Sequence, residues 1–251
     1  MKIRLIAAQV AAALLLALGT GAQAAEIKVL SSNAVKSVLE ELAPQFEKAT
    51  KNKIVFTFDT AAALKGQIEK GAAFDLAVLT DGAIDDLIKQ GKISGATRTA
   101  LARSGAGVAV KKGAPKPDIS TTEAFKRTLL AAKSIGFVEQ GATGIYLKSL
   151  LQRLGIADEL KPKLKMLVGV GAGEAVAKGE VEIGMTQIAE ILPYAGAELV
   201  GPLPAEIQVY TDFAVGVGAN AKDPEGARAL IKFLATPAAV SVIKAKGLAP
   251  R

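Results

Sequence analysis

Hydrophobic and polar positions follow two different periods along the chain, and segments of the two kinds alternate. Apolar residues at every second position, rich in β-branched side chains, predict strands, whereas apolar residues spaced by three and four predict helices. The predicted strands lie in EIKVLSS (26–32), KIVFTFDT (53–60), FDLAVLTD (74–81), SGAGVAVKKG (104–113), SIGFVEQ (134–140), EVEIGM (180–185) and IQVYTDFAVGVGA (207–219). The predicted helices span 35–50, about 62–70, 122–132, the segment after the glycine turn at 141, a start after 187, and most of 223–247.

This alternation indicates the fold class. The near-continuous apolar run at 74–81 is typical of a parallel strand covered on both faces. Strands separated by helices favour an α/β fold with a doubly wound sheet. A chain of 251 residues, half of them hydrophobic, can bury one large core or two smaller lobes, and the strand at 207–219 could cross between two lobes.

The first 24 residues follow a different pattern, which predicts export. Lys2 and Arg4 precede an apolar stretch over 5–18, and the small-residue sequence Ala-Gln-Ala follows at 22–24. These are the three parts of a secretory signal peptide. A membrane anchor is disfavoured, because the fully apolar portion is short for a span and a cleavage-type sequence follows it. We therefore expect a signal peptide at 1–24 and a periplasmic protein.

Composition narrows the chemistry. The sequence has no cysteine and no histidine, so disulfides, thiolate chemistry and the commonest zinc ligand are excluded. Lys and Arg number 31 against 24 Asp and Glu, a mild excess that suits an anionic ligand. Aromatic residues make up only 4% and arginine runs are missing, so we expect no nucleic-acid partner.

Small or amide-bearing residues follow four of the predicted strands. Ligands of open α/β sheets bind beyond the carboxyl ends of the strands, where the free N–H groups of a helix start hold anions. An ordinary helix cap is the alternative explanation for any one of these strand-to-helix corners, but four together favour a site. The corners are Ser31 to Ala34, Asp59 to Ala62, Gly141 to Gly144, and Thr186 with Gln187.

Other binding motifs are missing from the sequence. It holds neither a phosphate-binding G-x-x-x-x-G-K-[ST] loop nor a G-x-G-x-x-G between a strand and a helix, so nucleotide binding is not expected. Asp81, Asp85 and Asp86 lack the spacing of a calcium loop and fit an acidic first helical turn better. We expect no metal and no cofactor.

Five longer stretches resemble the periplasmic molybdate-binding family of ABC-transporter solute receptors, and the similarity runs over essentially all of 26–250. They are IKVLSSNAVKSVLEELAPQFEKAT (27–50), FTFDTAAALKGQIEKGAAFDLAVLTD (56–81), GATGIYLKSLLQRLG (141–155), GEVEIGMTQ (179–187) and LATPAAVSVIKAKG (234–247). The resemblance implies a two-lobed periplasmic-binding-protein fold of the class II type, with mixed doubly wound sheets and an interlobe cleft. One lobe is expected to comprise 25–104 with 214–251, and the other 105–213.

The resemblance also implies where an oxyanion binds, by hydroxyl and backbone N–H groups and without a metal. The family's first two serine ligands fall at Ala34 and Ala61, and its cleft tyrosine falls at Gln187. A backbone ligand falls at Thr143, and a further one near 169–171. Losing three side-chain donors weakens a site for a small dianion, since each buried donor contributes about 1–3 kcal/mol. Either Ser32, Asn33 and Thr60 compensate, or the ligand is a larger organic anion; we favour the second.

Candidate cations for an organic carboxylate are Lys36, Lys65 and Arg103. Arg103 stands at the expected boundary between lobes, where a guanidinium could bind a carboxylate through two hydrogen bonds, although a surface role fits it equally. Tyr146 could face the cleft or pack inside the lobe. The predicted ligand-binding residues are Ser32, Asn33, Ala34, Thr60, Ala61, Arg103, Thr143 and Gln187.

Three functions remain open from the sequence. The first is a monomeric receptor that captures a small di- or tricarboxylate such as aconitate and delivers it to an ABC permease. The second follows from the resemblance, because some exported proteins of this fold are aconitate isomerases, which interconvert cis- and trans-aconitate by allylic proton transfer. Capture of molybdate or tungstate is the third. An isomerase needs a base, and Lys36, Asp59, Lys65 and Glu139 lie near the corners without a choice among them.

Overall fold

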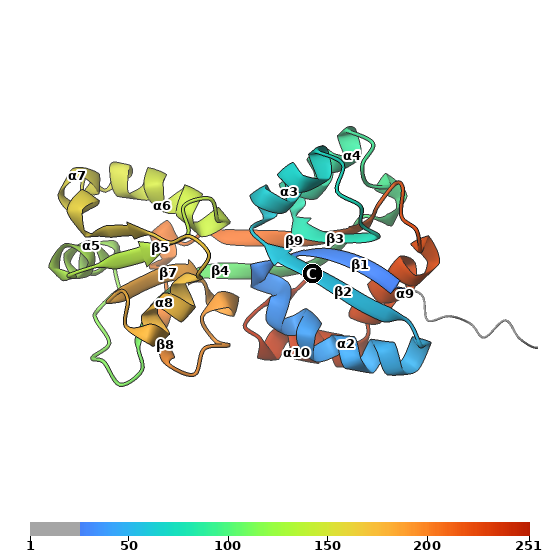
Figure 1. Ribbon diagram of the computed structural model, residues 1–251. Coiled ribbons are helices and arrows are strands. Elements are labelled where there is room, and N and C mark those ends of the chain that lie inside the picture. The colour runs from blue at the N-terminus through green and yellow to red at the C-terminus, as the bar shows by residue number, and fades with distance from the viewer. Residues whose placement is uncertain (1–25) are drawn as a thin grey trace, which may run out of the picture.

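The computed structural model describes residues 26–251, and the predicted signal peptide at 1–24 lies outside the described residues. The chain forms two lobes of strands and helices, with strands passing from one lobe to the other (Figure 1). The strands are β1 (Glu26–Ser32), β2 (Lys53–Asp59), β3 (Leu76–Thr80), β4 (Thr99–Lys111), β5 (Ile135–Phe137), β6 (Leu164–Met166), β7 (Ile183–Gln187), β8 (Ala197–Pro202), β9 (Tyr210–Val217) and β10 (Ala249–Pro250). The helices are α2 (Lys36–Thr50), α3 (Ala61–Glu69), α4 (Asp81–Lys89), α5 (Thr122–Ala131), α6 (Ala142–Arg153), α7 (Ala157–Leu160), α8 (Ala172–Lys178), α9 (Pro224–Leu234) and α10 (Pro237–Ala245), with short 3₁₀ turns η1 (Asn33–Val35) and η4 (Ile188–Glu190) among others.

The first lobe is built on the strand order β2-β1-β3-β9-β4. Strands β1, β2 and β3 run parallel, so their carboxyl ends lie along one edge, and β9 pairs with β3 antiparallel. Side chains alternate between the two faces of the sheet: Leu76 and Val78 of β3 pack with α2, α9 and α10, whereas Ala77 and Leu79 pack with α3 and α4. The lobe is thus covered on both faces, as the apolar run at 74–81 predicts.

The second lobe is built on the order β4-β7-β5-β6, with β8 paired to β4. Its parallel strands β5, β6 and β7 also end along one edge. Helices α5, α6 and α7 cover one face, around Phe125 and Phe137, and α8 covers the other. The expected α/β fold with mixed sheets is therefore confirmed, while the residue boundaries of the lobes stay a prediction.

Strands β4 and β9 connect the lobes. β4 pairs with β9 over Thr99–Gly105 in the first lobe and with β7 over Ala106–Val110 in the second. A register shift between Ala100 and Ala102 marks an irregularity in the β4–β9 ladder. The two connecting strands run antiparallel to each other, and together they form the two-stranded connection between the lobes that we call the β4–β9 ribbon.

The sequence pattern predicts most elements but misses several in the second half of the chain. β4 begins at Thr99, five residues before its predicted strand, and the predicted C-terminal helix is divided into α9 and α10. The break falls at Thr236, whose side chain caps α10 ahead of Pro237. The missed elements are α7, α8, β6, β8 and β10, and the helix predicted to start after 187 is only the 3₁₀ turn η4.

Over residues 26–251 no single helix reaches the length and apolarity of a membrane span, and only α9 and α10 taken together, across a bend of 69°, do so.

Candidate functional site

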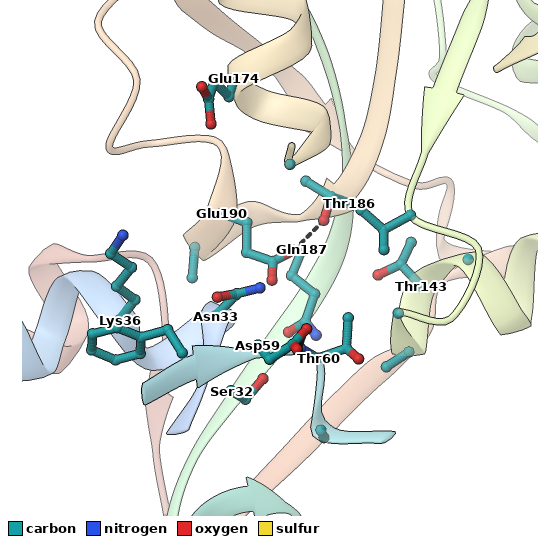
Figure 2. Close-up of a pocket in the computed structure, with 18 of the residues that line it drawn as sticks. Ser32, Asn33, Lys36, Asp59, Thr60, Thr143, Glu174, Thr186, Gln187 and Glu190 are labelled. Atoms are coloured by element: carbon teal, nitrogen blue, oxygen red, sulfur yellow. Dashed lines mark hydrogen bonds between the residues drawn. The ribbon is translucent and has the colours of Figure 1, made fainter. Parts of the chain in front are cut away.

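The carboxyl ends of the parallel strands of both lobes line one cavity of about 600 Å³ (Figure 2). Loops after β1, β2 and β3 form the wall on the first lobe, and loops after β5, β6 and β7 form the wall on the second. All four predicted strand-to-helix corners contribute residues to this lining. The cavity thus lies where α/β sheets place their ligands.

The first-lobe wall presents polar side chains at two helix starts. Ser32 precedes η1 without bonding its backbone, so its hydroxyl is not used as a helix cap. Thr60 caps α3 by accepting a hydrogen bond from Ala63 N at 3.2 Å. Asp59 accepts from Thr60 N at 2.7 Å. Asn33 belongs to the first corner and lies between Ser32 and Glu190 in Figure 2.

The second-lobe wall includes the start of α6, where the backbone approaches very closely. A Cβ atom at Gly144 would lie 2.0 Å from the carbonyl oxygen of Val138, so only glycine fits at this position. Gly141 caps α6 and has no side chain to bond its first N–H groups, which are left for other partners. Thr143 is buried at this corner, and its side chain is directed towards the cavity in Figure 2.

A second glycine contact fixes the opposite side of this wall. A Cβ at Gly173 in α8 would lie 2.4 Å from the carbonyl oxygen of Glu190, so the start of α8 is held directly against η4. Gly169, Val170 and Gly171 precede α8 and line the cavity, so the predicted backbone contact near 169–171 falls at this wall.

Charge in the cavity is unevenly distributed. Among the described residues that line it, Lys36 is the one cation, whereas Glu40, Asp59, Glu174 and Glu190 are acids. Lys36 lies 3.8 Å from Glu40, and a lysine outside the cavity, Lys178, bonds Glu174 at 2.6 Å. An anion in this cavity must therefore be held mainly by N–H and O–H groups, since little positive charge faces it.

Glu190 differs from the other acids in its surroundings. The Thr186 hydroxyl donates a hydrogen bond to Glu190 Oε2 (Figure 2), and the carboxyl also accepts from the backbone of Gln187. Burial raises the pKa of Glu190, and these two hydrogen bonds only partly offset that effect. Burial likewise raises the pKa of Tyr194, and the nearby carboxylates of Glu174 and Glu190 add to the increase.

Gln187 carries an unused polar atom at the cavity wall. The residue is 95% buried, with 5% exposed surface, and its Oε1 has no hydrogen-bond partner among the described residues. A buried amide oxygen without a donor is uncommon in folded proteins. This orphan atom supports a ligand-facing role for Gln187.

The structure brings together six of the eight predicted ligand-binding residues. Those that line the cavity are Ser32, Asn33, Thr60, Ala61, Thr143 and Gln187. Ala34 is fully buried behind the first corner and is not part of the lining. Arg103 lies outside the cavity, because the β4–β9 register places it opposite Asp212, which it bonds at 2.6 and 3.0 Å. Its guanidinium is thus paired within the β4–β9 ladder and does not reach this cavity as a carboxylate clamp.

The other candidates from the sequence divide in the same way. Lys36 and Asp59 line the cavity, whereas Lys65 pairs with Glu69 at 2.7 Å and Glu139 with Lys148, both outside the lining. The Tyr146 hydroxyl donates a hydrogen bond to the carbonyl oxygen of Ile207 at 2.8 Å, so this side chain is held within the second lobe and does not line the cavity.

Sequence reasoning missed Glu190, Glu174 and Tyr194. A signal for Glu190 was present, because an acid three residues after the cap position of η4 fits a capping box, whose side chain returns to the cap N–H. Tyr194 and Glu174 line the cavity because α8 and the segment beginning with η4 meet at one wall. No local sequence pattern indicates that contact. Within the described residues, no three or more Asp or Glu side chains gather as a possible metal-binding group.

The sequence matches the family described as bacterial extracellular solute-binding proteins over residues 27–249. The chain therefore belongs to this family, and its resemblance to the molybdate-binding receptors is confirmed. It is 28% identical over 227 residues to the molybdate-binding protein ModA of Escherichia coli (strain K12), covering 88% of each chain. The periplasmic molybdate-binding protein of Azotobacter vinelandii shares its fold, with a TM-score of 0.72 at 21% identity, over 88% of this chain and 98% of that one.

A relative with an enzymatic name is also similar. The chain is 33% identical over 230 residues to an aconitate isomerase of a Pseudomonas species, covering 89% of this chain and 87% of that protein. The chain is thus similar to a binding protein and to an isomerase over nearly the same region.

Proposed function

We propose that this protein captures a small organic polycarboxylate, of the size and chemistry of aconitate, in the cavity between its lobes. The single observation that carries the proposal is the convergence of strand-to-helix corners from both lobes on one cavity whose described lining holds several hydroxyl and amide groups but a single cation. Free N–H groups at helix starts and hydroxyls of Ser32, Thr60 and Thr143 supply donors for carboxylate oxygens.

The size of the cavity favours an organic ligand. A volume of about 600 Å³ lies in the range of about 300–1,000 Å³ typical of pockets for small organic molecules. A tetrahedral metal oxyanion needs a much tighter cage of donors. At the positions where the resemblance implies serine hydroxyls, this chain has Ala34 and Ala61, and Gln187 stands in place of a phenol.

A receptor role places the protein outside the inner membrane. Members of the family are extracellular solute-binding proteins, and the predicted signal peptide at 1–24 agrees with a periplasmic location. In this role the loaded protein would deliver its ligand to an ABC permease, as a monomer with a single ligand between its lobes.

Ligand-linked stabilisation tests the proposal directly. The mature protein would be screened by thermal shift and by isothermal titration calorimetry against cis-aconitate, trans-aconitate, citrate, sulfate and molybdate. We expect stabilisation by one or more of the tricarboxylates and none by molybdate. Binding of molybdate at micromolar concentration, with no response to the tricarboxylates, would contradict the proposal.

A second candidate function is the interconversion of cis- and trans-aconitate. Two observations favour it: the 33% identity to an aconitate isomerase, and the desolvated carboxyl of Glu190 on the wall of the cavity. In this reaction a base takes a proton from the methylene carbon, the double bond shifts by one position, and a proton returns to the former vinyl carbon. Atoms and charge balance without a cofactor, and the raised pKa of Glu190 is suited to a base.

The second candidate requires its own measurement. Proton NMR of cis-aconitate incubated with the mature protein would follow the vinyl signals of both isomers over time. Formation of trans-aconitate above a heat-treated control is the expected result for an isomerase. Tight binding of aconitate without conversion would leave the receptor role and remove the isomerase.

A further inference from the structure

Glu190 occupies the junction between the two lobes. It ends η4, and the neighbouring Ala189 packs into the hydrophobic core of the first lobe, although η4 follows β7 of the second lobe. Its backbone carbonyl is in close contact with Gly173 of α8. Its side chain lines the cavity, so a ligand held between the lobes lies next to this carboxyl.

The carboxyl of Glu190 has no cationic partner among the residues that the structure describes. Across residues 26–251, no lysine or arginine lies within ion-pair distance of Glu190. Its hydrogen-bond donors are the neutral Thr186 hydroxyl and the backbone of Gln187. An ionised, partly buried carboxylate directly beside a ligand carboxylate is strongly disfavoured, because two like charges cannot both stay ionised at contact distance.

We infer that Glu190 recognises the ligand through a shared proton, held between its carboxyl group and a carboxylate of the bound polycarboxylate. One proton is bound in the complex for each ligand, whether it arrives on Glu190 or on the ligand. The bond is a charge-assisted O–H···O contact, and no covalent bond changes. This inference rests on the proposed function, since it requires a carboxylate ligand in the cavity.

Other ionisable groups facing the same space come from every neighbouring element. They are Lys36 and Glu40 of α2, Asp59 of β2, Glu174 of α8, and Tyr194 beyond η4. Lys36 and Glu40 offset each other, Glu174 is paired with Lys178, and Asp59 already accepts the Thr60 N–H. The raised pKa of Glu190, caused by burial, agrees with its role as the proton-holding group.

The inference is tested by measuring trans-aconitate binding as a function of pH. For the wild type, calorimetry from about pH 5 to about pH 8 should show Kd rising by up to about tenfold per pH unit above the pKa of Glu190 in the free protein. Titrations in two buffers of different ionisation enthalpy should show uptake of about one proton per ligand at the upper end of this range.

Substitutions assign the proton to a residue. Glu190→Gln keeps the shape and the acceptor for Thr186, and its amide can donate to the ligand, so it should bind with little pH dependence and without proton uptake. Glu174→Gln and Asp59→Asn remove other acids of the same cavity and should keep the wild-type slope. Ionisation of aconitate itself is common to all four proteins, so the difference between their slopes is the decisive quantity.

The outcomes separate this inference from the proposed function. Wild-type affinity that is equal at every pH, or a slope that survives in Glu190→Gln, would overturn the shared proton while leaving polycarboxylate binding intact. A slope lost in Asp59→Asn instead would assign the proton to Asp59 and reject Glu190. No binding of any tricarboxylate at any pH would reject the proposed function, and the shared proton with it.

Discussion

Gln187 shows how a single side chain reports on a ligand. Its Oε1 is buried without a donor, whereas Gln208, elsewhere in the second lobe, uses both ends of its amide: Nε2 donates to Ala106 O at 3.1 Å and Oε1 accepts from Val209 N at 2.8 Å. The first amide is incompletely bonded in the folded protein, and the second is a structural cross-link.

The two glutamines should therefore respond in opposite ways to the same substitution. Gln187→Leu is expected to leave the free energy of unfolding unchanged or higher and to weaken tricarboxylate binding about tenfold, the value of one lost hydrogen bond. Gln208→Leu should destabilise the protein by about 1–3 kcal/mol and leave the affinity unchanged. Urea unfolding and calorimetry measure both quantities. Equal affinity of wild type and Gln187→Leu would remove Gln187 from the site.

Glu190 also makes the stability of the free protein depend on pH. Because its pKa is raised above the ordinary value of 4.5 by burial, the folded state holds the proton more strongly than the unfolded state. Its contribution is fully present below about pH 4.5 and is lost as the pH rises through the raised pKa. Glu190→Gln should thus gain stability relative to the wild type as the pH rises above 4.5, measured by urea unfolding at several pH values. A difference that stays constant with pH would show that burial does not shift this pKa.

For single residues, the sequence predicts which side chains lie near the cavity better than it predicts which residues they bond. Ser32, Thr60 and Thr143 stand at strand ends, and their place in the cavity follows from the direction of the parallel strands. The partner of Arg103 depends on the register between β4 and β9, which are separated by more than a hundred residues. Local pattern contains no information on such a register, so the pair with Asp212 could not be predicted.

At the scale of elements, glycine decides how closely two segments approach. Gly144 in the first turn of α6 lies against the Val138 carbonyl, whereas Gly66 inside α3 has open space where a Cβ would be. Both glycines have ordinary helical backbone, so they differ only in the atoms that surround the position of a Cβ.

Alanine at these two positions should have opposite effects on stability. Gly144→Ala forces α6 away from the preceding loop and should destabilise the protein by about 1–3 kcal/mol, and it should also weaken ligand binding by moving a corner of the cavity. Gly66→Ala should stabilise α3 by about 0.5–1 kcal/mol, since alanine loses less entropy in a helix. Thermal or urea unfolding of both variants provides the check, and a stable Gly144→Ala would show that the loop yields easily.

The elements that the sequence misses share a physical cause. α8 is seven residues long and rich in glycine and alanine, so it has little apolar periodicity. β8 is a partly exposed strand beside β4, and its pattern of polar and apolar residues is weak. Tertiary contacts rather than local propensity stabilise both elements: α8 packs against β4 and β7, and β8 pairs with β4. The wall that carries Glu174 and Tyr194 was missed for the same reason.

For the whole molecule, two lobes on a two-stranded connection imply closure around a ligand. The cavity has walls on both lobes, so a ligand that contacts both stabilises the closed arrangement. Small-angle X-ray scattering should show a smaller radius of gyration with saturating trans-aconitate than without it. The Glu190→Gln variant is expected to retain binding, so its radius of gyration should also decrease at saturating trans-aconitate. Identical scattering curves with and without bound ligand would exclude closure.

The β4–β9 ribbon limits the form that this motion can take. Its ladder of hydrogen bonds resists sliding of one strand along the other, because a slip by one residue would turn every side chain to the opposite face. Bending or twisting of the ribbon breaks no such bond, so we expect the lobes to move chiefly by rotation about this connection. Since the sequence has no cysteine, two engineered cysteines, one on α2 and one on α8, could each carry a spectroscopic label without background labelling. The distance between the two labels would then report the rotation of one lobe relative to the other.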